Sequence, residues 1–164
     1  MGLAPLQVDG IAYPLEQVEA LLFDGSILPT AVSLQDPQTL AMTILDAAWS
    51  KNAYQTRIYD VRKLVDYTDL FVILTGRSER QVAAIADAVE ADLKARGAAP
   101  AGVEGRKTAT WILLDFGSVV VHVFEKGTRE YYDLDRLWAD APVIEVEEPA
   151  WVLDFTRMES EPSY

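Results

Sequence analysis

The chain has 164 residues, half of them apolar, which is enough for one folded domain with a hydrophobic core and some additional segments. It contains no cysteine and a single histidine, His122, so disulfides and thiolate metal sites are excluded and a zinc site would depend on carboxylates. The formal net charge of -12 disfavours direct, sequence-specific binding of nucleic acid, because the phosphate backbone is itself negative.

The acidity is concentrated at the two ends of the chain. Residues 1–57 carry a net charge of -4, residues 58–138 of -2 and residues 139–164 of -6. An acidic protein of this kind is suited to a basic protein partner. No apolar run reaches the roughly 18 residues that a membrane helix needs. No Lys or Arg precedes Lys51, so neither a secretory leader nor an Arg-rich transit peptide fits, and we expect a cytoplasmic protein.

Residues 1–35 are expected to form an N-terminal extension. Pro14 and Gly25 bracket a stretch with helical spacing of leucine and valine, which predicts a short amphipathic helix. This segment is either a docking arm or an extension that covers the core or remains solvated, and the second interpretation is favoured.

Residues 36–142 predict one domain. Asp36 and Pro37 are typical of a helix start, and apolar residues at helical spacing extend this helix to about Ala53. A strand is predicted over 58–64, and the continuous apolar run 70–74 indicates a central strand buried on both faces. Ser78 with Gln81 forms a capping-box pattern that opens a helix ending at Gly97.

A loop is predicted over 97–110, followed by a hairpin of strands 111–116 and 119–124 that turns at Gly117. A short helix over 131–138 would place Leu134, Leu137 and Trp138 in the core. Residues 143–164 form an acidic C-terminal tail that begins with a possible edge strand over 143–146 and carries apolar residues around Trp151. The element order predicts an α/β (α+β) fold with a mixed β-sheet flanked by helices.

Six motifs follow one another at short spacing within residues 36–142. They are the segments 60–62 (DVR), 68–73 (TDLFVI), 75–78 (TGRS), 111–117 (WILLDFG), 119–124 (VVVHVF) and 129–138 (REYYDLDRLW). Together they resemble the ribosomal silencing factor family, also called the Iojap-like family (RsfS in bacteria). The two extensions, 1–35 and 143–164, depart from the short pattern of that family.

The resemblance implies a nucleotidyltransferase-like fold without enzymatic activity or cofactor. It also implies binding to the L-fourteen protein of the large ribosomal subunit, which would block association with the small subunit and repress translation under nutrient limitation. Homodimer formation is a further implication. Carried over to this chain, the family's binding surface points to the hairpin and nearby loops, at Trp111, Asp115, Phe116, His122, Arg129, Tyr131 and Tyr132.

The chemistry of these residues suits a protein interface, because aromatic side chains give contact area at low entropic cost and Asp115 can pair with a basic partner. Each also has a structural alternative. Trp111 is either a core anchor or an interface residue, whereas Phe116, beside Gly117, is expected at the interface. A lone strand histidine such as His122 is more often structural than catalytic. Adjacent Tyr131 and Tyr132 suggest that at least one faces the core.

Two other functions compete with this interpretation. The Gly76–Ser78 turn opens a helix as in nucleotidyltransferases, but the paired carboxylates that hold magnesium there are missing, and Asp115 stands alone on its strand. The second alternative is an adaptor for another partner, with the acidic and apolar tail as a docking motif. A small basic patch at Arg77, Arg80, Arg106 and Lys107 is expected to be ordinary solvated charge.

Overall fold

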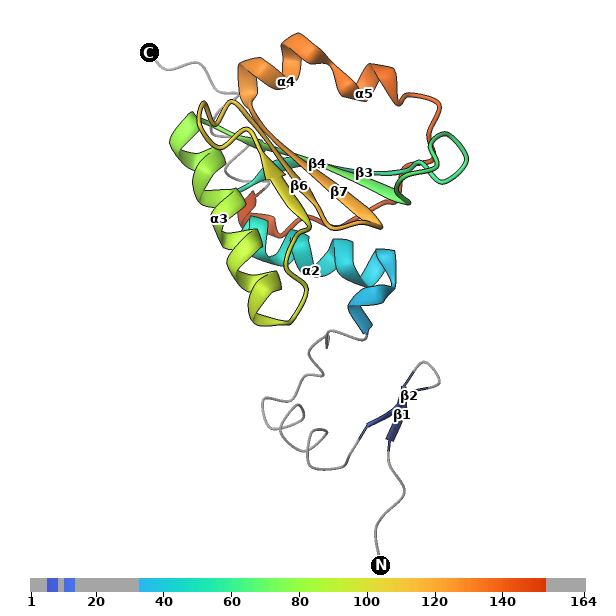
Figure 1. Cartoon of the computed structure of the whole chain (residues 1–164). Coiled ribbons are helices and arrows are strands. Elements are labelled where there is room, and N and C mark those ends of the chain that lie inside the picture. Colours follow the sequence, from blue (N-terminus) through green and yellow to red (C-terminus); the bar gives the residue numbers. More distant parts are fainter. Residues whose placement is uncertain (1–5, 9–10, 14–32, 153–164) are drawn as a thin grey trace, which may run out of the picture.

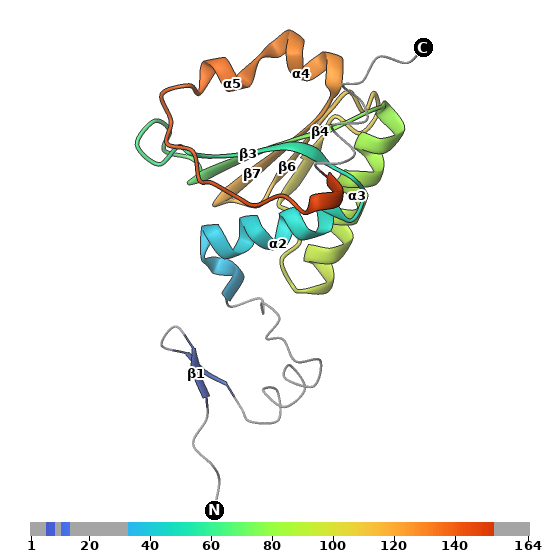
Figure 2. The same cartoon turned by 180° about the vertical axis from the view of Figure 1, so that it is seen from behind.

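The computed structural model describes residues 6–8, 11–13 and 33–152 (Figures 1 and 2). Near the N-terminus, β1 (Leu6–Val8) and β2 (Ile11–Tyr13) form a small antiparallel hairpin that the sequence patterns did not predict. The helix predicted between Pro14 and Gly25 lies outside the described residues.

A mixed sheet of five strands forms the centre of the main domain. Its strands are β3 (Tyr54–Asp60), β4 (Leu70–Gly76), β5 (Gly102–Glu104), β6 (Trp111–Asp115) and β7 (Val119–Glu125). Their order across the sheet is β3-β4-β7-β6-β5, with β4 and β7 parallel and the other neighbours antiparallel. This arrangement confirms the predicted α+β class with a mixed sheet.

Helices lie on both faces of this sheet. The short 3-10 turn η1 (Ser33–Gln35) leads into α2 (Pro37–Trp49), and α2 with α3 (Glu79–Ala95) covers one face. On the opposite face lie α4 (Lys126–Tyr132) and α5 (Leu134–Leu137), as both views show (Figures 1 and 2). The main hydrophobic core fills the space between the sheet and α2 and α3, and a smaller, more aromatic cluster lies on the α4–α5 side.

Both long helices begin at the capping residues that the sequence predicted. The Asp36 carboxylate accepts a hydrogen bond from the Thr39 amide at 3.0 Å, and the Ser78 hydroxyl accepts one from the Gln81 amide at 3.1 Å. The Gln81 side chain also reaches back to the Arg77 amide at 2.6 Å, and its Nε2 donates to the Lys51 carbonyl at 3.0 Å. Gln81 therefore joins the start of α3 to the end of the α2 region.

Several predicted boundaries were wrong. The strand predicted over 58–64 covers residues 54–60. Its first part contains a bulge between Tyr54 and Arg57, which interrupts the regular alternation of a strand. It ends before Val61, which begins a turn closed by hydrogen bonds from Leu64 and Val65. The predicted loop 97–110 contains the edge strand β5. Helix α2 ends at Trp49, short of Ala53.

The single helix predicted over 131–138 is two helices, α4 and α5, separated by Asp133 in the left-handed conformation (φ 49). This break turns Leu137 outward, so the prediction that it lies in the core was wrong: it is 68% exposed. Leu134 and Trp138 are partly buried against the smaller cluster. Residues 143–146 form a single bridge with β3, at Tyr59 and Val143, rather than a full edge strand.

Candidate partner-binding surface

An aromatic surface lies on the α4–α5 side of the sheet. We use this name for Trp111, Tyr131 and Tyr132 together with Phe124 beneath them. The centroid of the Trp111 ring is 5.0 Å from that of Tyr132 and 4.8 Å from that of Phe124, and Tyr131 and Tyr132 meet edge to face at 5.1 Å. Phe124 is fully buried, whereas Tyr131 and Tyr132 are 82% and 52% exposed. The prediction that one tyrosine faces the core was wrong.

The strand pattern explains why Trp111 belongs to this surface. Trp111, Leu113 and Asp115 alternate with the buried Ile112 and Leu114, so the first three share the α4–α5 face of β6. Trp111 is half-buried and packs against the smaller cluster. The core-anchor interpretation of Trp111 therefore agrees with the structure, and its ring also borders Tyr132. Its role at an interface stays a prediction.

His122 lies under the aromatic surface rather than on it, with 7% of its surface exposed. Its Nδ1 accepts a hydrogen bond from Trp111 Nε1 at 3.1 Å, and its ring meets Phe71 edge to face at 5.3 Å. Burial lowers the pKa of His122 to about 4, so the imidazole is neutral near pH 7 and carries its proton on Nε2. His122 thus fixes the orientation of the Trp111 indole.

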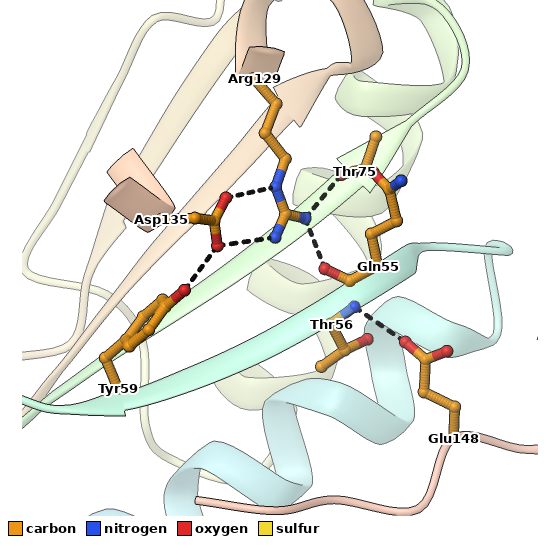
Figure 3. Close-up of polar contacts among 7 residues, drawn as sticks. All are labelled: Gln55, Thr56, Tyr59, Thr75, Arg129, Asp135 and Glu148. Atoms are coloured by element: carbon orange, nitrogen blue, oxygen red, sulfur yellow. Dashed lines mark hydrogen bonds and ion pairs between the residues drawn. The ribbon is translucent and has the colours of Figure 1, made fainter. Parts of the chain in front are cut away.

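Arg129 is the centre of a buried polar network that ties α4 to the sheet (Figure 3). Its Nε and Nη2 each donate to the Asp135 carboxylate at 3.1 Å, forming a bidentate ion pair. Its Nη1 donates to the Thr75 hydroxyl at 2.7 Å and to the main-chain carbonyl of Gln55. The guanidinium is almost fully buried, so the structure places Arg129 inside the domain, two positions before Tyr131 in the chain.

Tyr59 completes this network by donating to Asp135 at 2.6 Å. Burial, together with the hydrogen bond to Asp135, raises the pKa of Tyr59 to about 12. Burial alone would raise the pKa of Asp135, but the hydrogen bonds from Arg129 and Tyr59 and the Arg129 charge outweigh it and lower that pKa. Asp135 therefore remains ionised at neutral pH, with a protonated Tyr59 beside it.

The peptide unit between Gln55 and Thr56 is held from both sides. Its carbonyl accepts from Arg129, and its amide donates to the Glu148 carboxylate at 2.8 Å (Figure 3). Gln55 has a positive φ of 52 and lies in the bulge of β3, where pairing with β4 is interrupted. The two side chains thus bind backbone groups that the sheet leaves unpaired.

Asp115 and Phe116 lie at the far end of the same hairpin. The Asp115 carboxylate accepts from the Gly117 amide at 2.8 Å, which stabilises a turn in which Gly117 has a positive φ of 84. Phe116 is partly buried and packs against the main core. Both residues therefore have a structural role at the turn, at the opposite end of β6 from Trp111.

A groove of about 870 Å³ borders the Arg129 network between β3, α4 and residues 146–150. The carboxylates of Glu130, Asp133 and Glu147 line it, together with Arg57. The predicted basic patch is already neutralised in part, because Arg106 forms ion pairs with Asp87 and Glu90 of α3.

No group of three or more His, Asp or Glu residues in the part of the chain that the structure describes is arranged to hold a metal ion. None of its helices combines the length and apolar character that a membrane crossing requires.

The sequence patterns missed the network around Arg129. The residues concerned are Gln55, Tyr59, Thr75, Asp135 and Glu148. Only the pair Arg129–Asp135 had a local signal, opposite charges six residues apart, whereas Thr56 and Glu148 are separated by 92 positions in the chain.

Comparison with known proteins gives consistent results. The model of the family described as "Ribosomal silencing factor during starvation" (RsfS) matches residues 34–163. A ribosomal silencing factor of Halalkalibacterium halodurans is 39% identical over 110 residues, covering 67% of this chain and 94% of the relative. A mouse protein named "Mitochondrial assembly of ribosomal large subunit protein 1" is 35% identical over 91 residues, covering 54% of this chain and 40% of that protein.

Two crystal structures share this fold. A crystal structure of a Chromobacterium violaceum protein superimposes with a TM-score of 0.62 and 32% sequence identity, covering 69% of this chain and 95% of that protein. A crystal structure from Bacillus halodurans has a TM-score of 0.60 and 37% identity, covering 66% of this chain and 99% of that one.

Proposed function

Because the chain belongs to the ribosomal silencing factor family, we propose that it binds the large ribosomal subunit, at the L-fourteen protein, and prevents the small subunit from joining. Such binding represses translation when nutrients are limiting. The name of the mouse relative, which refers to the large ribosomal subunit, supports a large-subunit partner, and the names of the bacterial relatives describe silencing factors rather than enzymes. The protein would act in the cytoplasm, alone or as a homodimer.

The aromatic surface is the observation that carries this proposal. Tyr131 and Tyr132 are two exposed tyrosines in direct contact, next to a Trp111 that is fixed by His122 and Phe124. Rigid aromatic side chains of this kind dominate the binding energy at the centres of protein interfaces. Arg129 supports them from inside by anchoring α4 to the sheet.

The charge of the chain favours a basic protein as the direct partner. The net charge of -12 gives an acidic field, and Glu130 and Asp133 are exposed beside the two tyrosines. Complementary charge at the rim of an interface accelerates association and selects the partner more than it adds affinity. A basic ribosomal protein fits this chemistry better than bare RNA.

Sedimentation of the full chain with separated ribosomal subunits tests the proposal. We expect co-migration with the large subunit only, and slower subunit joining in a light-scattering assay. The double variant Tyr131→Ala/Tyr132→Ala should raise the Kd for the large subunit at least about fivefold, the effect of losing about 1 kcal/mol of interface contact. The matched control is Tyr67→Ala, because Tyr67 is also an exposed tyrosine (63%) but lies in the β3–β4 loop.

Binding to neither subunit at physiological salt would contradict the proposal and favour the adaptor alternative. An equal loss of affinity in the double variant and in Tyr67→Ala would mean that the chain binds the large subunit through a surface other than the aromatic surface.

A further inference from the structure

We propose that Glu148 is a positioning residue for the aromatic surface: through the Gln55–Thr56 peptide and Arg129, it sets the place of α4 and of the tyrosines at its end. The effect of Glu148 on the position of α4 depends only on contacts within the domain. The effect on partner binding rests on the proposed function.

Glu148 belongs to a segment that follows the open edge of the sheet, residues 142–152, which we name the C-terminal strap. The Asp60 amide donates to the Pro142 carbonyl at 2.8 Å, and the Ile144 amide donates to the Ile58 carbonyl at 2.9 Å. The inward residues Ile144, Val146 and Glu148 alternate with exposed ones, and Val152 at the end is fully buried in the main core. The strap is therefore fixed at both ends, with Glu148 between them.

Glu148 acts at the one place where β3 cannot pair regularly. The bulge at Gln55 turns the Gln55–Thr56 peptide out of register with β4, so its amide and carbonyl need other partners. Glu148 binds the amide and Arg129 binds the carbonyl of this same peptide unit. Because the Gln55–Thr56 peptide unit is planar and rigid, a change in its orientation at Glu148 also changes the position of the carbonyl that Arg129 binds.

Arg129 carries this coupling to α4. The helix has only seven residues, too few to be stable without tertiary contacts, and Arg129 is its one buried residue. Besides Gln55, the guanidinium holds Thr75 on β4 and Asp135 on α5. Thr75 in turn donates to the Gln55 side chain at 3.2 Å, so Gln55 is joined to this site by its main chain and its side chain. A shift of the Gln55–Thr56 peptide therefore displaces the anchor of α4.

Three variants of the full chain test the inference. Glu148→Ala removes the acceptor for the Thr56 amide, Glu148→Gln removes the charge but keeps an acceptor oxygen, and Glu147→Ala makes the same charge change at the exposed neighbour. Hydrogen exchange followed by mass spectrometry reports on peptides covering β3, α4 and α3. Large-subunit affinity is measured on the same samples.

In Glu148→Ala we expect faster exchange in residues 54–57 and 126–132, unchanged exchange in α3, and large-subunit binding about twofold to thirtyfold weaker. Glu148→Gln should restore most of both effects, and Glu147→Ala should show neither. Unchanged exchange in α4 of Glu148→Ala, an equal change in α3, or the same effect in Glu147→Ala would overturn the inference. If α4 responds as expected but the wild-type chain binds no large subunit, the positioning role stands and the proposed function fails.

Discussion

The hydrogen bonds of Arg129 to oxygen acceptors from three different parts of the domain offset the cost of burying its charge. Asp135 supplies the negative charge, while Thr75 and the Gln55 carbonyl accept from the remaining side of the guanidinium. A lysine at this position would offer a single ammonium without the planar fork that the bidentate contact requires. The same residue that the family resemblance assigns to binding thus has a clear structural task directly beneath the proposed surface.

Replacing Arg129 by Met should lower the free energy of unfolding by about 3 kcal/mol, because Asp135 would lose its partner in a partly buried site. The value lies at the low end for broken buried pairs because water still reaches the Asp135 side chain. Urea denaturation at neutral pH measures it. Arg57→Met is the control, since Arg57 is exposed, and a loss of equal size there would contradict the structural role of Arg129.

His122 makes the stability of the domain depend on pH. Its pKa is about 4 in the folded chain, against the ordinary 6.5, so the unfolded chain binds more protons between these values. Stability therefore rises with pH through this window and is lost as the pH falls from about 6.5 to 4, by about 3 kcal/mol in all. The lowered pKa of Asp135 adds a further loss at more acidic pH.

His122→Gln keeps an acceptor for the Trp111 indole but does not titrate, so its unfolding free energy should be almost independent of pH between about pH 5.5 and 6.5. Urea denaturation of both chains across that range measures the difference. Because His122 is the only histidine, a wild-type chain without a slope in this range would show that its imidazole is not buried in the neutral form.

At the scale of elements, the sheet and its covering helix approach each other closely at the turn from β4 into α3. A Cβ added at Gly76 would lie 2.9 Å from Val82 Cγ2 and 3.1 Å from the Val82 amide nitrogen. The absence of a side chain therefore lets the first turn of α3 pack directly on the end of the strand. This packing role accounts for Gly76 without a phosphate ligand.

Gly76→Ala should destabilise the domain by about 1–3 kcal/mol, because the backbone of α3 cannot move away without disturbing the main core. Gly102→Ala is the matched control on the edge strand β5: nothing lies within 4 Å of its added Cβ, and its effect should stay within about 0.5 kcal/mol. Thermal or urea unfolding of both variants measures the two changes in stability. Equal effects would mean that the α3 packing is not as close as described.

At the scale of the whole molecule, the C-terminal strap covers part of the edge strand β3. β3 is the outermost strand on its side, and an exposed edge of this kind invites pairing with another chain. The strap occupies the edge through the Asp60–Pro142 and Ile58–Ile144 hydrogen bonds and one bridge pair. The acidic tail therefore begins as part of the domain.

A chain that ends at Pro142 should associate through the uncovered β3 edge, whereas a chain that ends at Val152 keeps the whole strap and should behave as the full-length protein does. Sedimentation velocity over a range of concentrations measures this, with circular dichroism as the check that both truncated chains are folded. A folded chain ending at Pro142 whose mass distribution matches that of the full-length protein would show that the strap is not needed to protect the edge.

The sequence by itself determined the buried central strand, the caps of the long helices and the α+β class with a mixed sheet, because local spacing of apolar residues and capping side chains indicate these elements. It did not indicate the β1–β2 hairpin or the edge strand β5. It also pointed to the aromatic residues, through the motifs of the family. The tertiary structure alone decided that His122 is buried while both tyrosines are exposed, since Trp111 and Phe71 cover His122 on the sheet whereas the tyrosines end α4 and point to solvent. It alone joined Gln55, Arg129 and Glu148, because long-range contacts of this kind leave no periodic pattern in the chain.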